Sequence, residues 1–181
     1  MNTHLPSHLV VGNTISWTTS DGSVSSPRQP PHVGPIPVLD GQGTSRHMEE
    51  ILPGTERYQS WLAIVGTVVA REMLGTTKND GPYYMVDFPE GYSLYYRFTK
   101  YPQASGSKPR RDQYLWGAKN IVFRSPNEFT PHALWLMKGA RADDPCQCIY
   151  CTDRVKPSQI DINKEFKLPG IRSHRDKHHY K

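Results

Sequence analysis

The 181-residue sequence lacks most of the features that mark membrane, secreted or enzymatic chains. No apolar run approaches the roughly 18 residues that a membrane-spanning helix needs, so we expect no membrane partner. The first residues have neither the cationic flank nor the apolar run of a signal peptide. Three cysteines are too few for a disulfide framework, and no motif for phosphate cradling or nucleophile activation occurs. The sequence therefore predicts a protein that is not an enzyme and has no small-molecule substrate.

The composition limits the size of the core and divides the chain. With 16 prolines and 14 glycines, a good share of the chain is loop or tail. Residues 20–45 are rich in Gly, Ser and Pro and bury too little surface to offset the entropy lost on ordering. We expect an extended or disordered arm over 1–50, within which a strand could dock, an ordered domain over 51–152, and a basic tail over 153–181.

Positive charge is concentrated in one part of the chain. The net charge is +5, but residues 97–141 hold nine Lys or Arg against two Asp or Glu, a net of +7. Such a block predicts a polyanionic partner that is bound mainly through its phosphates, with the cationic side chains displayed together on one side. The alternative is an ordinary solvated face of Lys and Arg, which is the usual fate of charge runs.

Hydrophobic spacing predicts a helix over residues 55–73, in which apolar side chains recur three and four positions apart. Thr55 can cap this helix and Gly75 can end it. Gly66 in its interior indicates the close approach of another element, because glycine there is otherwise unfavourable. Period-two alternation and aromatic content predict short strands at 83–88, 92–100, 112–116 and 121–123.

A second helix is expected over residues 126–138. Ser125 and Glu128 form an S-x-x-E capping box, and Pro126 occupies the first helical position, where its missing N–H has no consequence. Pro131 would remove one backbone hydrogen bond inside the helix, so the sequence predicts either a restart or a bend there.

The three cysteines, Cys146, Cys148 and Cys151, lie within six residues of one another. Their spacing suits zinc, whose tetrahedral coordination needs a fourth ligand. Among eight histidines, His132 is the leading candidate because it lies one helix upstream of the thiols. Alternative ligands come from the tail: His174, His178 and His179. A loop of free thiols is the metal-free alternative.

The predicted fold class is therefore α+β. A small antiparallel sheet would pack on helices near 55–74 and 126–138, and a Cys-rich zinc loop would close the domain. The zinc would be structural.

The stretch from residue 88 to 135 carries a characteristic order of short motifs. It has a Pro-Glu-Gly-aromatic start, a basic hairpin loop, an Asp-x-Tyr strand and a Phe-Arg-Ser helix start, at 89–92, 100–111, 112–114 and 123–125. This order resembles the methyl-CpG-binding domain. With the His, Trp-Leu and Cys-x-Cys-x-x-Cys series that follows, residues 50–152 resemble the amino-terminal region of the fungal transcription-silencing cryptic-loci-regulator proteins.

This resemblance implies a nuclear chromatin module in transcriptional silencing and heterochromatin, with a methyl-CpG-binding-domain-like core. It implies DNA as a partner, with RNA as an alternative, and the subunits of a histone-deacetylating and remodelling complex. Proteins of this family are larger than this chain and carry further domains. A hypothesis of a different class is a protein-interaction scaffold of the silencing complex that does not bind DNA directly.

The Phe-Arg-Ser arginine of the methyl-CpG-binding family reads guanine, so the resemblance assigns this role to Arg124. Its guanidinium can donate two hydrogen bonds to one guanine; a surface salt bridge to Glu128 is the alternative. The second guanine-reading arginine of that family corresponds to Thr99 here, which predicts weak sequence preference. The predicted nucleic-acid-binding residues are Arg97, Lys100, Lys108, Arg110, Arg111, Asp112, Tyr114 and Arg124.

Overall fold

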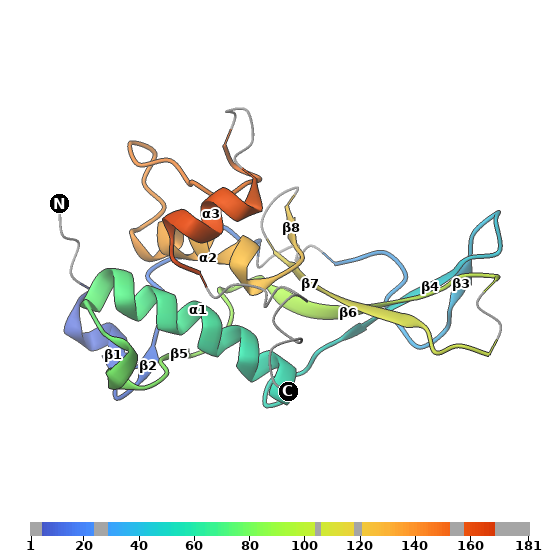
Figure 1. Cartoon of the computed structure of the whole chain (residues 1–181), viewed down its shortest axis with the longest axis horizontal. Helices are drawn as coiled ribbons and strands as arrows, with labels where there is room; N and C mark the ends of the chain where they lie inside the picture. Colours follow the sequence, from blue (N-terminus) through green and yellow to red (C-terminus); the bar gives the residue numbers. More distant parts are fainter. Residues whose placement is uncertain (1–4, 24–28, 104–105, 118–120, 153–157, 169–181) are drawn as a thin grey trace, which may run out of the picture.

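A computed structural model describes residues 5–23, 29–103, 106–117, 121–152 and 158–168 (Figure 1). The architecture is α+β, with small sheets packed on helices, as the sequence predicts. Within the described ranges no helix is both long and apolar enough to cross a bilayer. In chain order the elements are η1 (Ser7–Leu9), β1 (Val10–Val11), β2 (Thr14–Ile15), β3 (Val38–Leu39), β4 (Ser45–Glu50), α1 (Glu56–Leu74), η2 (Lys78–Asp80), β5 (Tyr84–Met85), β6 (Ser93–Lys100), β7 (Arg110–Trp116), β8 (Val122–Phe123), α2 (Pro126–Met137) and α3 (Gln159–Glu165).

The larger sheet has its strands in the order β3-β4-β6-β7-β8, all antiparallel to their neighbours. β6 and β7 form a long hairpin that extends, with β3 and β4, away from the helices (Figure 1). β4 pairs with β6 over its whole length, starting from Ser45 opposite Lys100. Sequence reasoning assigns no strand to residues 45–50, because Met48 is their single apolar side chain and no alternation marks them.

A second, smaller sheet joins the N-terminal segment to the domain. β1 and β2 form a hairpin, and β2 runs parallel to β5, with Thr14 opposite Tyr84 and Ile15 opposite Met85. Ile15 and Met85 are both buried, so the pairing is supported by the core as well as by backbone hydrogen bonds. The strand predicted at 83–88 is thus shorter than expected, and it pairs with the N-terminal segment rather than with the larger sheet.

α1 agrees with the helix predicted from hydrophobic spacing. Thr55 Oγ1 accepts a hydrogen bond from the Tyr58 N–H (3.4 Å), and Gly75 ends the helix in a left-handed conformation (φ 70°). Gly66 faces β5, where a Cβ atom would lie 2.6 to 2.7 Å from backbone atoms of residues 83–85. The close approach expected at this glycine is confirmed.

α2 begins at the predicted cap, where Ser125 Oγ accepts a hydrogen bond from the Glu128 N–H (3.2 Å). The helix continues through Pro131 without a restart. Because Pro131 has no N–H to donate, the carbonyl of Asn127 accepts a hydrogen bond from Gln159 Nε2 instead (3.3 Å). Gln159 belongs to α3, so this short helix compensates for the proline.

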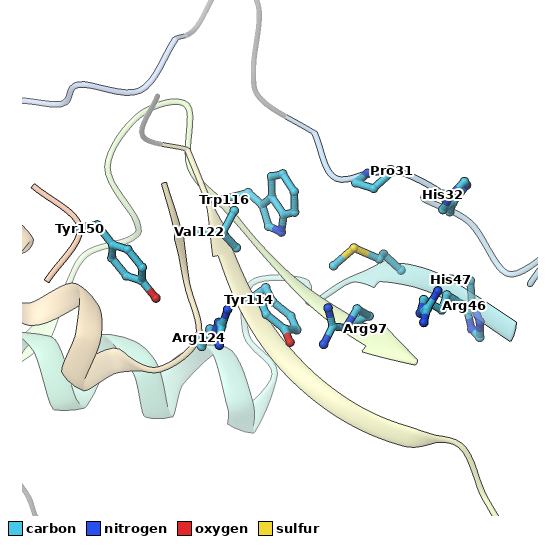
Figure 2. A pocket seen from close by; sticks show the side chains of 11 residues that line it. Pro31, His32, Arg46, His47, Arg97, Tyr114, Trp116, Val122, Arg124 and Tyr150 are labelled. Carbon is cyan, nitrogen blue, oxygen red and sulfur yellow. The ribbon is translucent and has the colours of Figure 1, made fainter. Parts of the chain in front are cut away.

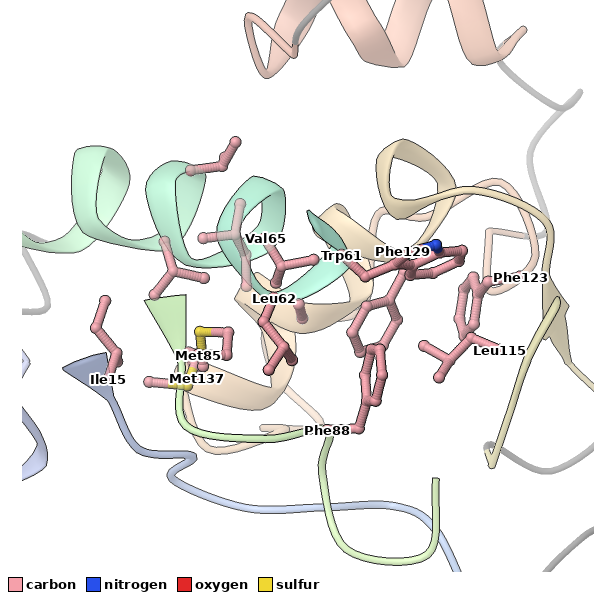
Figure 3. Packing of buried hydrophobic residues seen from close by; sticks show 14 of the residues in the cluster. Ile15, Trp61, Leu62, Val65, Met85, Phe88, Leu115, Phe123, Phe129 and Met137 are labelled. Atoms are coloured by element: carbon pink, nitrogen blue, oxygen red, sulfur yellow. The ribbon is translucent and has the colours of Figure 1, made fainter. Parts of the chain in front are cut away.

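The core lies between α1, α2 and the two sheets (Figure 3). Trp61 of α1 is fully buried and donates its indole N–H to Gln113 Oε1 (2.7 Å). Phe123 of β8 packs edge-on against Phe129 of α2, with ring centroids 5.0 Å apart. Its ring also lies 5.5 Å from that of Tyr150, in the Cys-rich segment after α2. The core thereby connects the larger sheet to the cysteines.

Candidate metal centre and basic groove

Four side chains converge between α2 and the segment that follows it. The ligand atoms of His132, Cys146, Cys148 and Cys151 all lie within 4.8 Å of one another. His132 Nδ1 is 3.3 Å from Cys146 Sγ and 3.6 Å from Cys151 Sγ. Tetrahedral zinc with three sulfur ligands and one nitrogen ligand would separate neighbouring ligand atoms by about 3.5 to 3.8 Å. The donor set and its spacing therefore fit a tetrahedral metal ion.

Tight turns in the backbone bring the three sulfurs together. The Cys151 N–H donates to the Cys148 carbonyl (3.1 Å), and the Cys148 N–H points to Cys146 Sγ (3.5 Å). Cys146 and Cys148 are buried, as is His132, which lies on the core side of α2. The alternative ligands His174, His178 and His179 are outside the described residues. The cluster predicted from the cysteine spacing is thus the one that the structure brings together.

The ring orientation of His132 is fixed from its other side. His132 Nε2 lies 3.2 Å from Asp21 Oδ2 and 3.2 Å from the Tyr92 hydroxyl. Tyr92 in turn donates its hydroxyl hydrogen to Asp21 Oδ1 (2.5 Å). A histidine that gives one ring N–H to a carboxylate presents its other nitrogen to a metal. Asp21 therefore orients Nδ1 of His132 toward the three sulfurs.

Asp21 reaches the cluster on a segment, residues 16–22, that we call the N-terminal strap. The strap is held by hydrogen bonds to backbone carbonyls in the loop after β5 and at the end of α2. Trp17 Nε1 donates to the Asp87 carbonyl (2.8 Å), and Thr18 Oγ1 donates to the Met137 carbonyl (2.9 Å). A Cβ on Gly22 would collide with the backbone at residues 90–91, so glycine allows the strap to pass close to the Pro-Glu-Gly turn.

The electrostatics of the cluster follow from burial and hydrogen bonding. Burial opposes the charged form of His132, but hydrogen bonds with Asp21, Cys148 and Cys151 outweigh it and raise its pKa to about 11. Burial likewise opposes the charged form of Asp21, but hydrogen bonds from His132 and Tyr92 lower its pKa.

The pKa values of two of the thiols shift in opposite directions. Hydrogen bonds from the Cys146 and Cys151 thiols lower the pKa of Cys148, whereas hydrogen bonds with Cys148 and Cys151 raise the pKa of Cys146. These hydrogen bonds therefore favour the thiolate form of Cys148 over that of Cys146. A metal ion that takes all four ligands would displace the remaining protons.

The second feature is a groove of about 540 Å³ on the face of the larger sheet that turns away from the core; we call it the basic groove (Figure 2). None of the described residues that line it is acidic. They are Pro31, His32, Arg46, His47, Met48, Arg97, Tyr114, Trp116, Val122, Arg124 and Tyr150.

Three of the predicted nucleic-acid-binding residues line the basic groove: Arg97, Tyr114 and Arg124. Figure 2 shows Tyr114 between the two arginines. The Arg97 guanidinium lies over the Tyr114 ring, 4.4 Å from its centroid, and 3.9 Å from the Asp112 carboxylate. Among the described residues, no ion pair involves the Arg124 guanidinium. Glu128, the alternative partner, instead accepts a hydrogen bond from the Arg124 backbone N–H (2.7 Å).

The other predicted residues are divided between the groove face and the opposite face of the sheet. β7 begins at Arg110, so side chains that were assigned to a loop alternate across a strand. Arg110 lies on the groove face and pairs with Asp112 (2.9 Å). Arg111 lies on the opposite face, with its guanidinium 4.4 Å from the Tyr96 ring centroid. Lys100 alternates to that opposite face, and Lys108 is exposed in the hairpin loop. The expectation that the cationic side chains share one side is therefore wrong for part of the set.

Comparison with known proteins identifies the central part of the chain. Residues 83–151 match the family model described as "Transcription-silencing protein, cryptic loci regulator Clr2". We call residues 83–151, which are similar to this family, the cryptic-loci-regulator segment. It contains all four cluster residues and the strands β6, β7 and β8, which line the basic groove together with β4. The resemblance predicted from the motifs is confirmed.

Cryptic loci regulator 2 of Schizosaccharomyces pombe is 29% identical to the chain over 85 residues. The alignment covers 46% of this chain and 15% of the yeast protein, so the chain spans only a small part of its relative's length. No solved structure matches the chain, and the methyl-CpG-binding likeness of its core stays a prediction. Asp21 and Arg46 lie before the cryptic-loci-regulator segment in the chain, so the family match does not point to either residue.

Proposed function

We propose that the cryptic-loci-regulator segment is a non-enzymatic chromatin module of the nucleus that acts in transcriptional silencing and heterochromatin. It binds nucleic acid through the basic groove with little sequence preference. The observation that carries this proposal is Arg124, which lines the groove without an ion pair among the described residues. A guanidinium in this position can contact a phosphate or a guanine edge without first breaking an internal salt bridge.

Two further arginines supply charge along the groove. Arg97 is only loosely paired with Asp112, at 3.9 Å, and stacks on Tyr114. Arg46 is paired with Asp40 (2.7 Å), but both side chains are partly exposed and such a pair is weak in water. Because no acidic side chain among the described residues lines the groove, the local field favours a polyanion. The position that corresponds to a second guanine reader is Thr99, which is buried, so strict recognition of a methylated CpG step is not expected.

The proposal is tested by the salt dependence of duplex DNA binding. A contact with about three phosphates should weaken about 40-fold between roughly 50 and 200 mM salt. Replacement of Arg124 (Arg124→Ala) should lower the affinity for all sequences about tenfold and reduce the slope of log affinity against log salt by about 1. Fluorescence anisotropy with labelled duplexes measures both quantities.

Matched controls come from the same basic part of the chain. Lys138 pairs with Asp144, and Arg141 pairs with Asp143, both away from the groove. Lys138→Ala and Arg141→Ala remove the same charge and should change the affinity less than Arg124→Ala does. Equal losses in all three variants would show that net charge, and not the groove, determines binding. Absence of binding at both salt concentrations, for single strands as well as for the duplex, would leave the scaffold hypothesis.

We propose that a structural zinc ion is held by His132, Cys146, Cys148 and Cys151, because their chemistry and spacing fit it. The ion would fasten the segment after α2 to the helix. That segment also carries Tyr150, which lines the groove and donates its hydroxyl hydrogen to Glu128 (2.7 Å). The metal centre would thus hold one wall of the basic groove in place.

Replacement of Asp21 (Asp21→Ala) should weaken zinc binding about 10- to 100-fold, because His132 loses the carboxylate that orients it. Competition with a chromophoric chelator measures the affinity. Asp143→Ala is the matched control, since Asp143 is close to the cysteines in sequence but pairs with Arg141. Indistinguishable zinc affinities for Asp21→Ala and the unaltered protein would contradict the orienting role.

A scaffold function in the silencing complex is the second candidate, and one surface favours it. β3 is an edge strand of the larger sheet, and apolar side chains in it and just before it are exposed: Leu39 is 69% exposed and Ile36 is 79% exposed. An exposed apolar edge strand can accept a strand from a partner protein. The surface at Ile36 and Leu39 lies on a different part of the sheet from Arg124. Substitution of these two residues therefore leaves the DNA-binding test unaffected.

A further inference from the structure

The shape of the basic groove determines which nucleic acid it can hold. One wall is the chain at Pro31 and His32, which is tied to β4 by the hydrogen bond from the Met48 N–H to the His32 carbonyl (2.9 Å). The opposite wall carries Tyr150 from the Cys-rich segment (Figure 2). The volume of about 540 Å³ lies within the roughly 300–1,000 Å³ of pockets that enclose a small molecule. A concave, walled site of this size encloses a nucleotide more readily than the convex edge of a duplex.

The floor of the groove is aromatic as well as basic. Tyr114 and Trp116 come from β7, and the Arg97 guanidinium lies over the Tyr114 ring. Aromatic rings and guanidinium planes bind the faces of unstacked bases, with little preference among the four bases. In a duplex these faces are covered by the neighbouring base pairs, and only the base edges and phosphates are accessible. A duplex therefore makes no use of the aromatic floor.

We infer that the basic groove binds single-stranded nucleic acid, with an unpaired base against the Arg97–Tyr114 stack or Trp116 and a phosphate on Arg124. This inference rests on the proposed nucleic-acid function and specifies its substrate class. DNA and RNA both present the two groups that the groove would bind, a base face and the phosphate joined to it. Low sequence specificity follows, because every base has such a face.

The test compares single strands with a duplex on the whole chain. Labelled oligo-dT and oligo-U of about 12 nucleotides and a duplex of the same length are titrated by fluorescence anisotropy at fixed salt. We expect at least one single strand to bind about tenfold more tightly than the duplex. The two single strands distinguish DNA from RNA as the source of the ligand.

Tyr114→Leu should lower the affinity for the single strand about tenfold and leave the duplex affinity unchanged, whereas Tyr114→Phe should retain the affinity for both. The chain offers a matched control on the opposite face of the same hairpin. There Arg111 lies over Tyr96 at the same centroid distance of 4.4 Å. Tyr96→Leu removes an equivalent stacked pair outside the groove and should leave single-strand affinity unchanged. Should Tyr114→Leu fail to fold, Trp116→Leu on the groove floor provides the comparison at the other aromatic residue of the proposed site.

Three outcomes are distinguishable. Preference for the single strand that Tyr114→Leu abolishes and Tyr96→Leu does not would support the inference. Equal or tighter duplex binding, with no selective effect of Tyr114→Leu or Trp116→Leu, would overturn the inference while leaving the proposed nucleic-acid function intact. Failure of all three nucleic acids to bind would overturn both the inference and the proposed function.

Discussion

Replacement of Cys148 by serine (Cys148→Ser) should abolish stoichiometric zinc binding and lower the midpoint of thermal unfolding by about 10 °C or more. Cys148 is fully buried within the cluster. Structural zinc contributes apparent binding free energies of about 10–16 kcal/mol in small domains, so losing even a third of that is several kcal/mol. For a chain of this size, each kcal/mol corresponds to roughly 2–4 °C. Elemental analysis of the purified protein and calorimetry measure the two quantities.

His47→Ala is the control, because it changes a residue of the same domain that lies outside the metal cluster. His47 stacks on Phe98 (4.7 Å between ring centroids) and does not belong to the four-residue cluster. It should leave the zinc content unchanged. Chelation of zinc from the unaltered protein should reproduce the unfolding midpoint of Cys148→Ser. Protein that is purified without metal and gains no stability when zinc is added would contradict the metal centre.

The helices could be predicted from the sequence because their signals are local. Thr55 and Gly75 bracket α1, and Ser125 caps α2, all within a few residues of the hydrophobic periodicity that they limit. β4 could not be predicted in this way. Its residues are mostly polar, and their extended conformation is fixed by pairing with β6, which is distant in the sequence. The parallel pairing of β2 with β5 is equally non-local.

The residues of the candidate site can be separated in the same way, into those with a local sequence signal and those without one. The four candidate metal ligands were predictable because three thiols in six residues are an unusual local pattern. Asp21 was not, since it stands alone in a Gly- and Ser-rich stretch and reaches His132 only through the path of the N-terminal strap. Arg46 was missed with β4. The faces of Arg110 and Arg111 depended on where β7 begins, two residues earlier than the alternation in the sequence indicated.

The metal centre and the basic groove share one structural connection. Tyr150 lies between two of the cysteines in sequence, and its ring packs edge-on against Phe123 (5.5 Å), which in turn contacts His132 (5.2 Å). Its hydroxyl binds Glu128, the residue that also accepts a hydrogen bond from the Arg124 backbone. Loss of the metal would therefore disturb a groove wall and the backbone of Arg124 together. The structural role proposed for zinc is in this sense also a functional one.

Replacement of Gly66 by alanine (Gly66→Ala) should destabilise the protein by about 3 kcal/mol, although helix propensity alone favours alanine by about 1 kcal/mol. An added Cβ would lie 2.6 Å from the Tyr84 carbonyl carbon and 2.7 Å from both the Met85 nitrogen and the Tyr83 carbonyl oxygen. These are backbone atoms of β5 and of the residue just before it, and β5 is fixed by its pairing with β2. The helix or the small sheet would have to move to relieve the collision.

Chemical denaturation measures this change, and Gly41→Ala is its control. Gly41 lies in the turn between β3 and β4, and a Cβ there would meet no atom within 4 Å. Its replacement should alter the free energy of unfolding by less than about 0.5 kcal/mol. A Gly66→Ala protein as stable as the Gly41→Ala protein would mean that α1 and β5 do not approach so closely. The N-terminal strands, and with them the strap that carries Asp21, would then lack the anchorage on the domain that orients His132.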